Sequence, residues 1–141
     1  MDWKLEVVVI PVSDVDRAKA FYTERAGFVL DVDHRDGDTF RVVQVTPPGS
    51  ACSVTFGTGM LDPTAGPVKG LQLVVPDVQA AHAELAARGV EVSAVQHFES
   101  GAMVQGPGGD WNSFVFFADP DGNSWAVQQK PGGPAPDPSG L

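Results

Sequence analysis

An internal repeat constrains the fold of this chain more than any other feature of its sequence. A shift of 63 positions places Asp14-Val15 on Asp77-Val78, and a one-residue deletion then brings Gly27 onto Gly89. Small apolar residues recur by chance in helices, so the Asp-Val steps and the aligned arginines Arg25 and Arg88, each followed closely by a glycine, carry most of the argument. A duplication of this length repeats one supersecondary unit, and the sequence therefore predicts two similar modules.

The first module is predicted to run strand, helix, strand, strand, strand. Ser13 has the side chain of a helix cap. Phe21 and Tyr22 fall on the apolar face of the helix, and Gly27 supplies the left-handed residue that ends it. An Asp-Gly step indicates a hairpin turn between the second and third strands. The expected strands are residues 5–12, 28–34, 40–46 and 51–56, which set the first module at about 5–56.

The second module repeats this order after a linker at 57–69 that is rich in Gly, Pro and Thr. Asp77 caps its helix, which is expected to continue through Arg88. A long Gly-rich loop at 99–112 separates its second and third strands. Residues 130–141 are rich in Pro and Gly and are predicted to be a disordered tail. The expected strands are 71–75, 90–98, 113–117 and 125–129, so the second module spans about 70–129 of a single domain at 1–129.

The composition argues against several classes of function. A formal net charge of −9 argues against a nucleic acid or an anionic membrane as partner, because phosphate groups repel an acidic surface. No apolar run approaches the roughly 20 residues of a membrane span, and the segment Met1–Lys4 lacks the features of a signal peptide. Cys52 is the only cysteine, so no internal disulfide forms and a reducing cytoplasm is the expected compartment.

Two segments resemble those of a known superfamily. Ile10–Tyr22, followed by Gly27-Phe28, reads IPVSDVDRAKAFY and then GF, and Phe117–Asn123 reads FADPDGN. These segments resemble the opening and the closing turn of a glyoxalase/bleomycin-resistance (vicinal oxygen chelate) domain over about residues 5–129. The resemblance implies an α+β fold in which two βαβββ modules curl into a half-open, eight-stranded cleft. It also implies a homodimer, since family members usually dimerise and many complete the cleft across the dimer.

The resemblance also indicates where a divalent metal would bind, and this chain lacks donors there. Ligands in the metal-using enzymes come from positions that correspond to Val7, Gly70 and Ala126, and the matching strand of the first half offers only the hydroxyls of Ser53 and Thr55. Divalent ions need imidazole or carboxylate donors to replace their hydration shell. No metal and no other cofactor is therefore expected, and the sequence does not decide which of the two hydroxyls points inward.

Other donor side chains leave one alternative open. Gln72 lies two residues beyond Gly70 and faces the same side of its strand. His34 and His97 lie at nearly equivalent strand ends of the two modules. An atypical metal site built from these side chains stays as an alternative, although a single His at a strand end is usually a solvated surface residue. Cys52 has no neighbouring pattern of a catalytic thiol, and a buried structural role is expected for it.

Aromatic side chains give the chain its clearest candidate for a binding site. Most aromatic residues of a small domain pack in its core, but packing rarely requires a tryptophan inside a Gly-rich loop such as the one that holds Trp111. Phe98 and Met103 border the same loop and extend the candidate wall. The predicted ligand-binding residues, apolar walls with a few orienting polar groups, are Val7, Ser53, Thr55, Gln72, Phe98, Met103, Trp111, Phe116, Ala126 and Gln128.

These observations favour a metal-independent binding protein that holds a small apolar or aromatic organic molecule in a cleft. Drug-binding resistance proteins of the superfamily, which keep the fold without metal, are the nearest model that the resemblance offers. The alternative is an enzyme, either a lyase, an isomerase or a dioxygenase-like protein, that uses the same cleft through atypical ligands or through acid–base chemistry. A scaffold with a vestigial cleft is a third possibility. The expected partners are a small organic molecule and a second copy of the chain.

Overall fold

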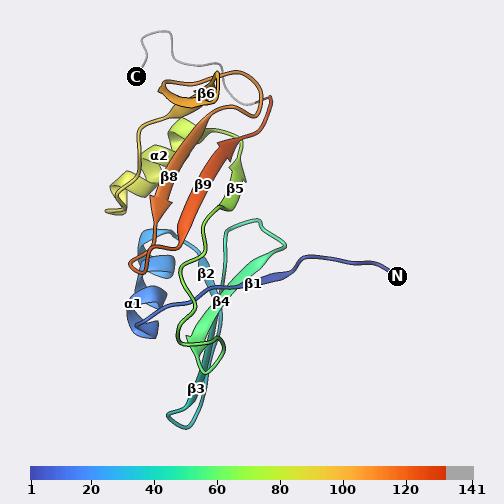
Figure 1. Ribbon diagram of the computed structural model, residues 1–141, viewed down its shortest axis with the longest axis vertical. Coiled ribbons are helices and arrows are strands. Elements are labelled where there is room, and N and C mark those ends of the chain that lie inside the picture. The colour runs from blue at the N-terminus through green and yellow to red at the C-terminus, as the bar shows by residue number, and fades with distance from the viewer. Residues whose placement is uncertain (133–141) are drawn as a thin grey trace. The chain divides into compact units, whose positions relative to one another are not determined.

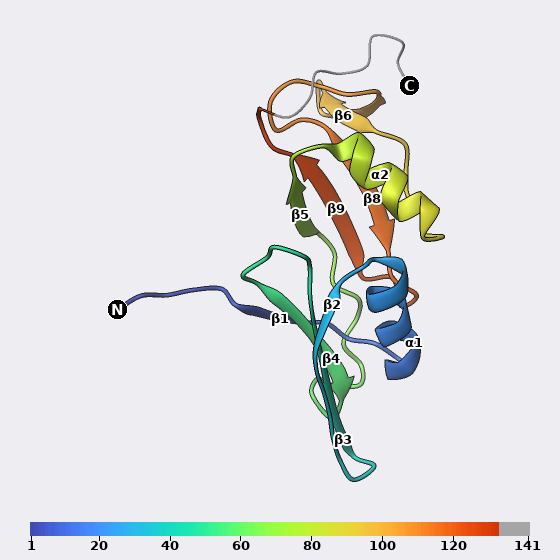
Figure 2. The ribbon, with the colours of Figure 1, turned by 180° about the vertical axis from the view of Figure 1, so that it is seen from behind.

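Two units make up the part of the chain that the computed structural model describes, residues 1–132. The first unit comprises Met1–Val68 together with Asp119–Asn123, and the second comprises Lys69–Ala118 and the described residues from Ser124 to 132. Each unit holds one β-sheet and one helical segment (Figure 1, Figure 2). Because each unit combines a helical segment with a mostly antiparallel sheet, the fold is α+β, as predicted.

The first unit contains a four-stranded sheet in the spatial order β1-β4-β3-β2. β1 runs parallel to β4, and the other neighbouring strands are antiparallel. The helical segment consists of α1 and a single π-type turn, η1, that continues it. The bounds are β1 (Val7–Val9), α1 (Val15–Ala20), η1 (Phe21–Arg25), β2 (Val29–Asp36), β3 (Phe40–Thr46) and β4 (Ser53–Thr58).

The second unit repeats this arrangement and adds one strand. Its sheet has the order β5-β9-β8-β6-β7, and β5 runs parallel to β9 as β1 does to β4. Without β7, the four strands of each sheet follow one another in the same order, which is the structural counterpart of the sequence repeat. The bounds are β5 (Leu71–Val75), α2 (Val78–Ala87), β6 (Gln96–Glu99), β7 (Ala102–Gln105), β8 (Phe114–Ala118) and β9 (Ser124–Gln129).

The added strand lies in the segment that the sequence indicated as a loop. Ser100 and Gly101 both adopt positive φ, 52° and 81°, and this tight turn folds β7 back onto β6. β6 itself begins later than the predicted residue 90, because the side chain of Ser93 replaces a ladder partner. Its hydroxyl accepts the Phe116 N–H at 2.9 Å, while the Ser93 N–H donates to the Phe116 carbonyl, also at 2.9 Å.

The two helices are capped by residues that the sequence repeat aligns, Asp14 and Asp77. Asp14, rather than Ser13, caps α1, and its carboxylate accepts the Arg17 N–H at 3.1 Å. Asp77 occupies the equivalent place before α2, as predicted. The predicted tail falls almost wholly on positions 133–141, outside the described residues. In the described chain, none of the helices has the length and apolar character that crossing a bilayer requires.

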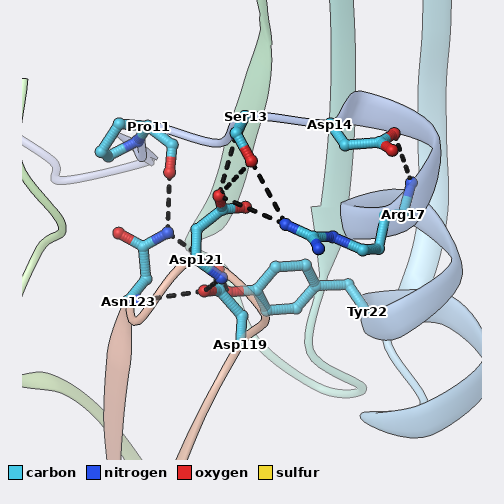
Figure 3. Close-up of polar contacts among 8 residues, drawn as sticks. All are labelled: Pro11, Ser13, Asp14, Arg17, Tyr22, Asp119, Asp121 and Asn123. Atoms are coloured by element: carbon cyan, nitrogen blue, oxygen red, sulfur yellow. Dashed lines mark hydrogen bonds and ion pairs between the residues drawn. The ribbon is translucent and has the colours of Figure 1, made fainter. Parts of the chain in front are cut away.

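A buried polar network joins the turn at Asp119–Asn123 to the start of the chain (Figure 3). The Tyr22 hydroxyl donates to Asp119 Oδ2 at 2.7 Å, and both residues are buried. Asn123 is fully buried, and its amide donates to the Pro11 carbonyl and to Asp119 Oδ2, both at 2.8 Å. Its amide oxygen accepts the Val68 N–H at 2.8 Å. The closing-turn motif therefore acts in this fold as a structural clamp within the first unit.

Candidate ligand-binding site

The face of the second sheet that α2 leaves uncovered carries most of the predicted site residues. The Gln129 side chain accepts the Val78 N–H of α2 at 3.0 Å, so Gln129 and Val127 point toward the helix. Side chains alternate along a strand, and the register between the strands then assigns the opposite face. We call this the open face, and on β5, β8 and β9 it consists of Gln72, Val74, Phe114, Phe116, Ala118, Ser124, Ala126 and Gln128.

Three phenylalanines form a row on the open face. The rings of Phe114 and Phe116 are stacked, with centroids 6.0 Å apart, and Phe98 meets Phe114 edge to face at 5.7 Å. Phe98 remains 51% exposed although it belongs to this aromatic row, so one ring is available to a ligand. Met103 is the register partner of Phe98 on β7. Aromatic rings that are packed on one side and open on the other are suited to stacking against a planar molecule.

A hollow of about 510 Å³ adjoins the aromatic row at Phe116. It is open because two of its positions carry almost no side chain: Ala126, the register partner of Phe116, and Gly70. Gly70 adopts φ +87°, and a Cβ placed on it would meet no atom within 4 Å. The lining residues are Gly70, Phe116, Phe117, Ala118, Ser124, Trp125 and Ala126.

The metal implied by the resemblance does not fit this hollow. Gly70 and Ala126 occupy two of the three ligand positions, and they bring a hydrogen atom and a methyl group where imidazole and carboxylate donors are needed. His34 and His97, the alternative donors, lie in different units, and Gln72 is engaged with Gln128. Within residues 1–132, no three His, Cys, Asp or Glu side chains are grouped so that they could hold a metal ion.

Trp111 stands beside the aromatic row in a conformation that is unusual for a bulky residue. Its φ is +60°, in the left-handed region that favours glycine, and its side chain is 51% exposed. Its carbonyl oxygen accepts a hydrogen bond from Gln128 Nε2 at 2.7 Å. Backbone strain of this kind persists only where the surroundings fix it, and it concentrates at functional sites.

Side chains of the loop and of β6 fix the backbone around Trp111. The side-chain amide of Asn112 satisfies both backbone polar groups of Phe98 on β6, as a neighbouring strand would. Its oxygen accepts the Phe98 N–H at 2.8 Å, and its nitrogen donates to the Phe98 carbonyl at 2.9 Å. His97 Nδ1 lies 2.7 Å from the Gly106 carbonyl oxygen, and Nε2 lies 3.1 Å from the Glu99 carboxylate. The Gly106 carbonyl and then Glu99 raise the pKa of His97, because both stabilise the protonated ring.

The remaining predicted residues lie on the first sheet. Val7 and Ser53 are register partners, as are Val9 and Thr55, so all four side chains point to the same face. The question of which hydroxyl points inward therefore has a simple answer: both lie on one face. Ser53 hydrogen-bonds Thr46 at 2.6 Å, whereas the buried hydroxyl of Thr55 has no partner among the described residues.

The structure thus divides the ten predicted residues between the two units. Seven lie together on or beside the open face of the second sheet, and Val7, Ser53 and Thr55 lie on the first sheet. Sequence reasoning missed Phe114, which joins Phe98 to Phe116. Its place in an aromatic run was visible, but the run alone does not show which rings α2 covers. The seven are Gln72, Phe98, Met103, Trp111, Phe116, Ala126 and Gln128.

Comparison with known families agrees with this fold. The model of the Glyoxalase/Bleomycin resistance protein/Dioxygenase superfamily matches residues 4–127. The chain belongs to this superfamily. The match includes both modules, as the resemblance of the opening and closing segments predicted.

Two solved structures and one further relative resemble this chain at moderate sequence identity. TnmS3, an antibiotic-binding protein from Streptomyces sp. CB03234, is 33% identical, with a TM-score of 0.70 over 92% of this chain and 97% of its own. A glyoxalase/bleomycin resistance protein from the same strain is 34% identical, with a TM-score of 0.68 over 89% of this chain and all of its own. The uncharacterised protein YetH of Bacillus subtilis (strain 168) is 25% identical over 127 residues, which cover 89% of this chain and 98% of YetH.

Proposed function

We propose that this chain is a metal-independent binding protein that holds an apolar or aromatic organic molecule on the open face of its second sheet. The observation that carries this proposal is the aromatic row of Phe98, Phe114 and Phe116, which ends at a hollow of about 510 Å³. A planar ligand seated there stacks on rings that the protein itself packs from behind. Its affinity comes from burying apolar surface, and the neighbouring amides orient it.

Two further observations support binding without a metal. The hollow exists because Gly70 and Ala126 carry no bulky side chain, so the same positions that lack metal donors provide space for a ligand. TnmS3, which is 33% identical over nearly the whole chain, is an antibiotic-binding protein. We therefore place the ligand among planar, mostly apolar organic molecules of the kind found in antibiotics.

We also propose that the protein acts as a homodimer. Trp3, Leu5, Val7 and Val9 alternate along the N-terminal segment and are all exposed, Trp3 by 84% and Leu5 by 77%. The chain ahead of β1 extends away from the first sheet in both views (Figure 1, Figure 2). An exposed apolar stripe beside a strand edge is a surface that proteins usually cover.

Cys52 is a free thiol, which fits the reducing cytoplasm where we place this function.

Replacement of Trp111 tests the binding site. We expect a planar aromatic antibiotic, found by screening a panel that includes bleomycin and daunorubicin, to bind stoichiometrically in isothermal titration calorimetry. Trp111→Ala should weaken that binding by about 1–3 kcal/mol, because a half-exposed stacking ring is lost. Trp111→Phe keeps an aromatic face and should retain most of the affinity. Because no metal is proposed to take part, a chelator should leave the Kd of the ligand unchanged. If Trp111→Ala binds the ligand as tightly as the parent protein, Trp111 does not belong to the site.

A further inference from the structure

A single hydroxyl group lies among the side chains that line the hollow of about 510 Å³ on the open face. It belongs to Ser124, which lies on the open face at the start of β9. Phe117 and Trp125 also line the hollow, but their rings are on the opposite face, where they are buried and stack at 6.0 Å. The other lining positions have no side chain that can hydrogen-bond: Gly70, Phe116, Ala118 and Ala126.

The hydroxyl proton of Ser124 is available to a ligand. The Gly70 N–H donates to Ser124 Oγ at 3.4 Å, so the hydroxyl accepts in this contact. A serine hydroxyl has one proton and two lone pairs. Since no other residue among 1–132 hydrogen-bonds to this side chain, its proton has no partner within the described chain. The hydroxyl can therefore donate to a ligand oxygen without giving up a bond within the protein.

The strand register places this hydroxyl next to a ring that stacks on Phe116. Phe116 is the partner of Ala126, and the next pair on the same face is Ala118 with Ser124. Two residues along a strand are about 7 Å apart. A fused two-ring molecule that lies over the Ala126 methyl group, with its long axis along the strands, therefore has one end at Phe116 and the other at Ser124.

From this arrangement we infer that Ser124 anchors the ligand, and that the hollow selects planar apolar molecules with an oxygen acceptor at the edge that enters it, such as aryl ketones. This inference rests on the proposed function and names the ligand chemistry of the same site. A buried polar atom without a partner costs free energy, so the apolar walls disfavour an oxygen at any other position in the hollow. A ligand without the oxygen gains nothing from the hydroxyl.

Two nearly isosteric probes, 2-acetylnaphthalene and 2-isopropenylnaphthalene, test this inference. They share a ring system, and the first has a carbonyl oxygen where the second has a methylene group. In isothermal titration calorimetry, Ser124→Ala should raise the Kd of 2-acetylnaphthalene by on the order of fivefold to tenfold, as expected for one net hydrogen bond. The Kd of 2-isopropenylnaphthalene should hardly change. Comparing each probe between the two proteins cancels the different hydration of the probes.

Ser124→Thr is the matched control, because it keeps a hydroxyl at this position and threonine is well suited to a strand. It should retain most of the affinity of the parent protein for 2-acetylnaphthalene. If Ser124→Thr loses the ketone as Ser124→Ala does, while it still binds the hydrocarbon, the hydroxyl is not the anchor and the inference is overturned.

The remaining outcomes separate the inference from the function on which it rests. If Ser124→Ala changes the Kd of both naphthalenes equally, or of neither, while Phe116→Ala weakens both, the aromatic site stands and the role of Ser124 is overturned. If only an antibiotic of the panel binds, an unchanged Kd for it in Ser124→Ala overturns the inference in the same way. If no compound binds, the proposed function fails, and the inference fails with it.

Discussion

Arg41 is a charged side chain in a buried place, on the helix-facing side of the first sheet. It is 8% exposed, and its guanidinium contacts Asp33 at 2.9 and 3.0 Å and Asp16 at 2.7 Å. Lys19 adds a contact to Asp33 at 2.8 Å. Hydrogen bonds from Arg41 and then from Lys19 hold the pKa of Asp33 well below its ordinary value. The same network raises the pKa of Arg41. The flat fork of arginine is what allows one side chain to join two carboxylates.

We expect Arg41→Met to lower the free energy of unfolding by about 1–3 kcal/mol at pH 7, because Asp33, whose side chain is 21% exposed, loses its main partner. Since the pKa of Asp33 is lowered on folding, its stabilising effect is present above 3.8 and is lost as the pH falls below that value. Urea denaturation at pH 7 and near pH 3 should therefore show the difference between parent and variant shrinking in acid.

Arg35 supplies the matched control for this experiment. It lies 3.9 Å from Asp16 but is 62% exposed, so water screens the pair. Arg35→Met should leave the unfolding free energy nearly unchanged at both pH values. An effect equal to that of Arg41→Met would mean that total charge, and not the buried fork, determines the acid sensitivity.

At the scale of elements, the turn between β8 and β9 is held by side chains from the opposite end of the sequence. We expect Asn123→Ala to destabilise the protein by about 2–3 kcal/mol, because the Pro11 carbonyl, the Val68 N–H and Asp119 all lose a partner in a buried place. Tyr22→Phe should cost about 1 kcal/mol, since Asp119 Oδ2 keeps its bond to Asn123.

Chemical denaturation with fluorescence detection measures both effects. Thr64→Ala, which alters a local turn with Asp62 on the exposed surface, is the control and should change little. If Asn123→Ala unfolds at the same denaturant concentration as the parent, the network in Figure 3 does not clamp the turn.

Most elements could be predicted from the repeat, because periodic apolar residues and helix caps act locally. β3 and β5 match their predicted ranges, and α2 begins at its predicted cap, Asp77. The start of β6 could not be predicted, since it depends on Ser93 bonding a strand that is distant in sequence. β7 is only four residues long and follows a Ser-Gly turn inside a Gly-rich segment, so its pattern was too short to stand out.

The candidate site was predictable in part for the same reason. Trp111 stood out because packing does not explain a tryptophan in such a loop, and the structure leaves it half-exposed. The stack of Phe114 on Phe116 depends on which face of β8 the helix covers, and strand periodicity alone does not contain that information. The hydrogen bond from Gln128 Nε2 goes to the backbone carbonyl of Trp111, a partner that no side-chain pattern reveals.

At the scale of the whole molecule, the exposed N-terminal stripe predicts self-association. Light scattering at tens of micromolar should give the mass of a dimer, because contact with a second copy would bury Trp3 and Leu5. Trp3→Ser combined with Leu5→Ser should shift the mass toward the monomer. Val74→Ser, which removes an exposed apolar side chain from β5, is the control. A monomeric mass for the parent protein would overturn the proposed homodimer.

The clamp at Asn123 has a consequence for how the protein is made. The N-terminal half leaves the ribosome first, yet its Val68 N–H finds its partner only after a further 55 residues have been added. At about 5–20 residues per second, this delay lasts roughly 3 to 11 seconds. During that interval the Tyr22 hydroxyl and the Pro11 carbonyl also lack the partners that the closing turn brings. The first module therefore completes its fold after translation of the second, and a message truncated before codon 119 yields an N-terminal half without its clamp.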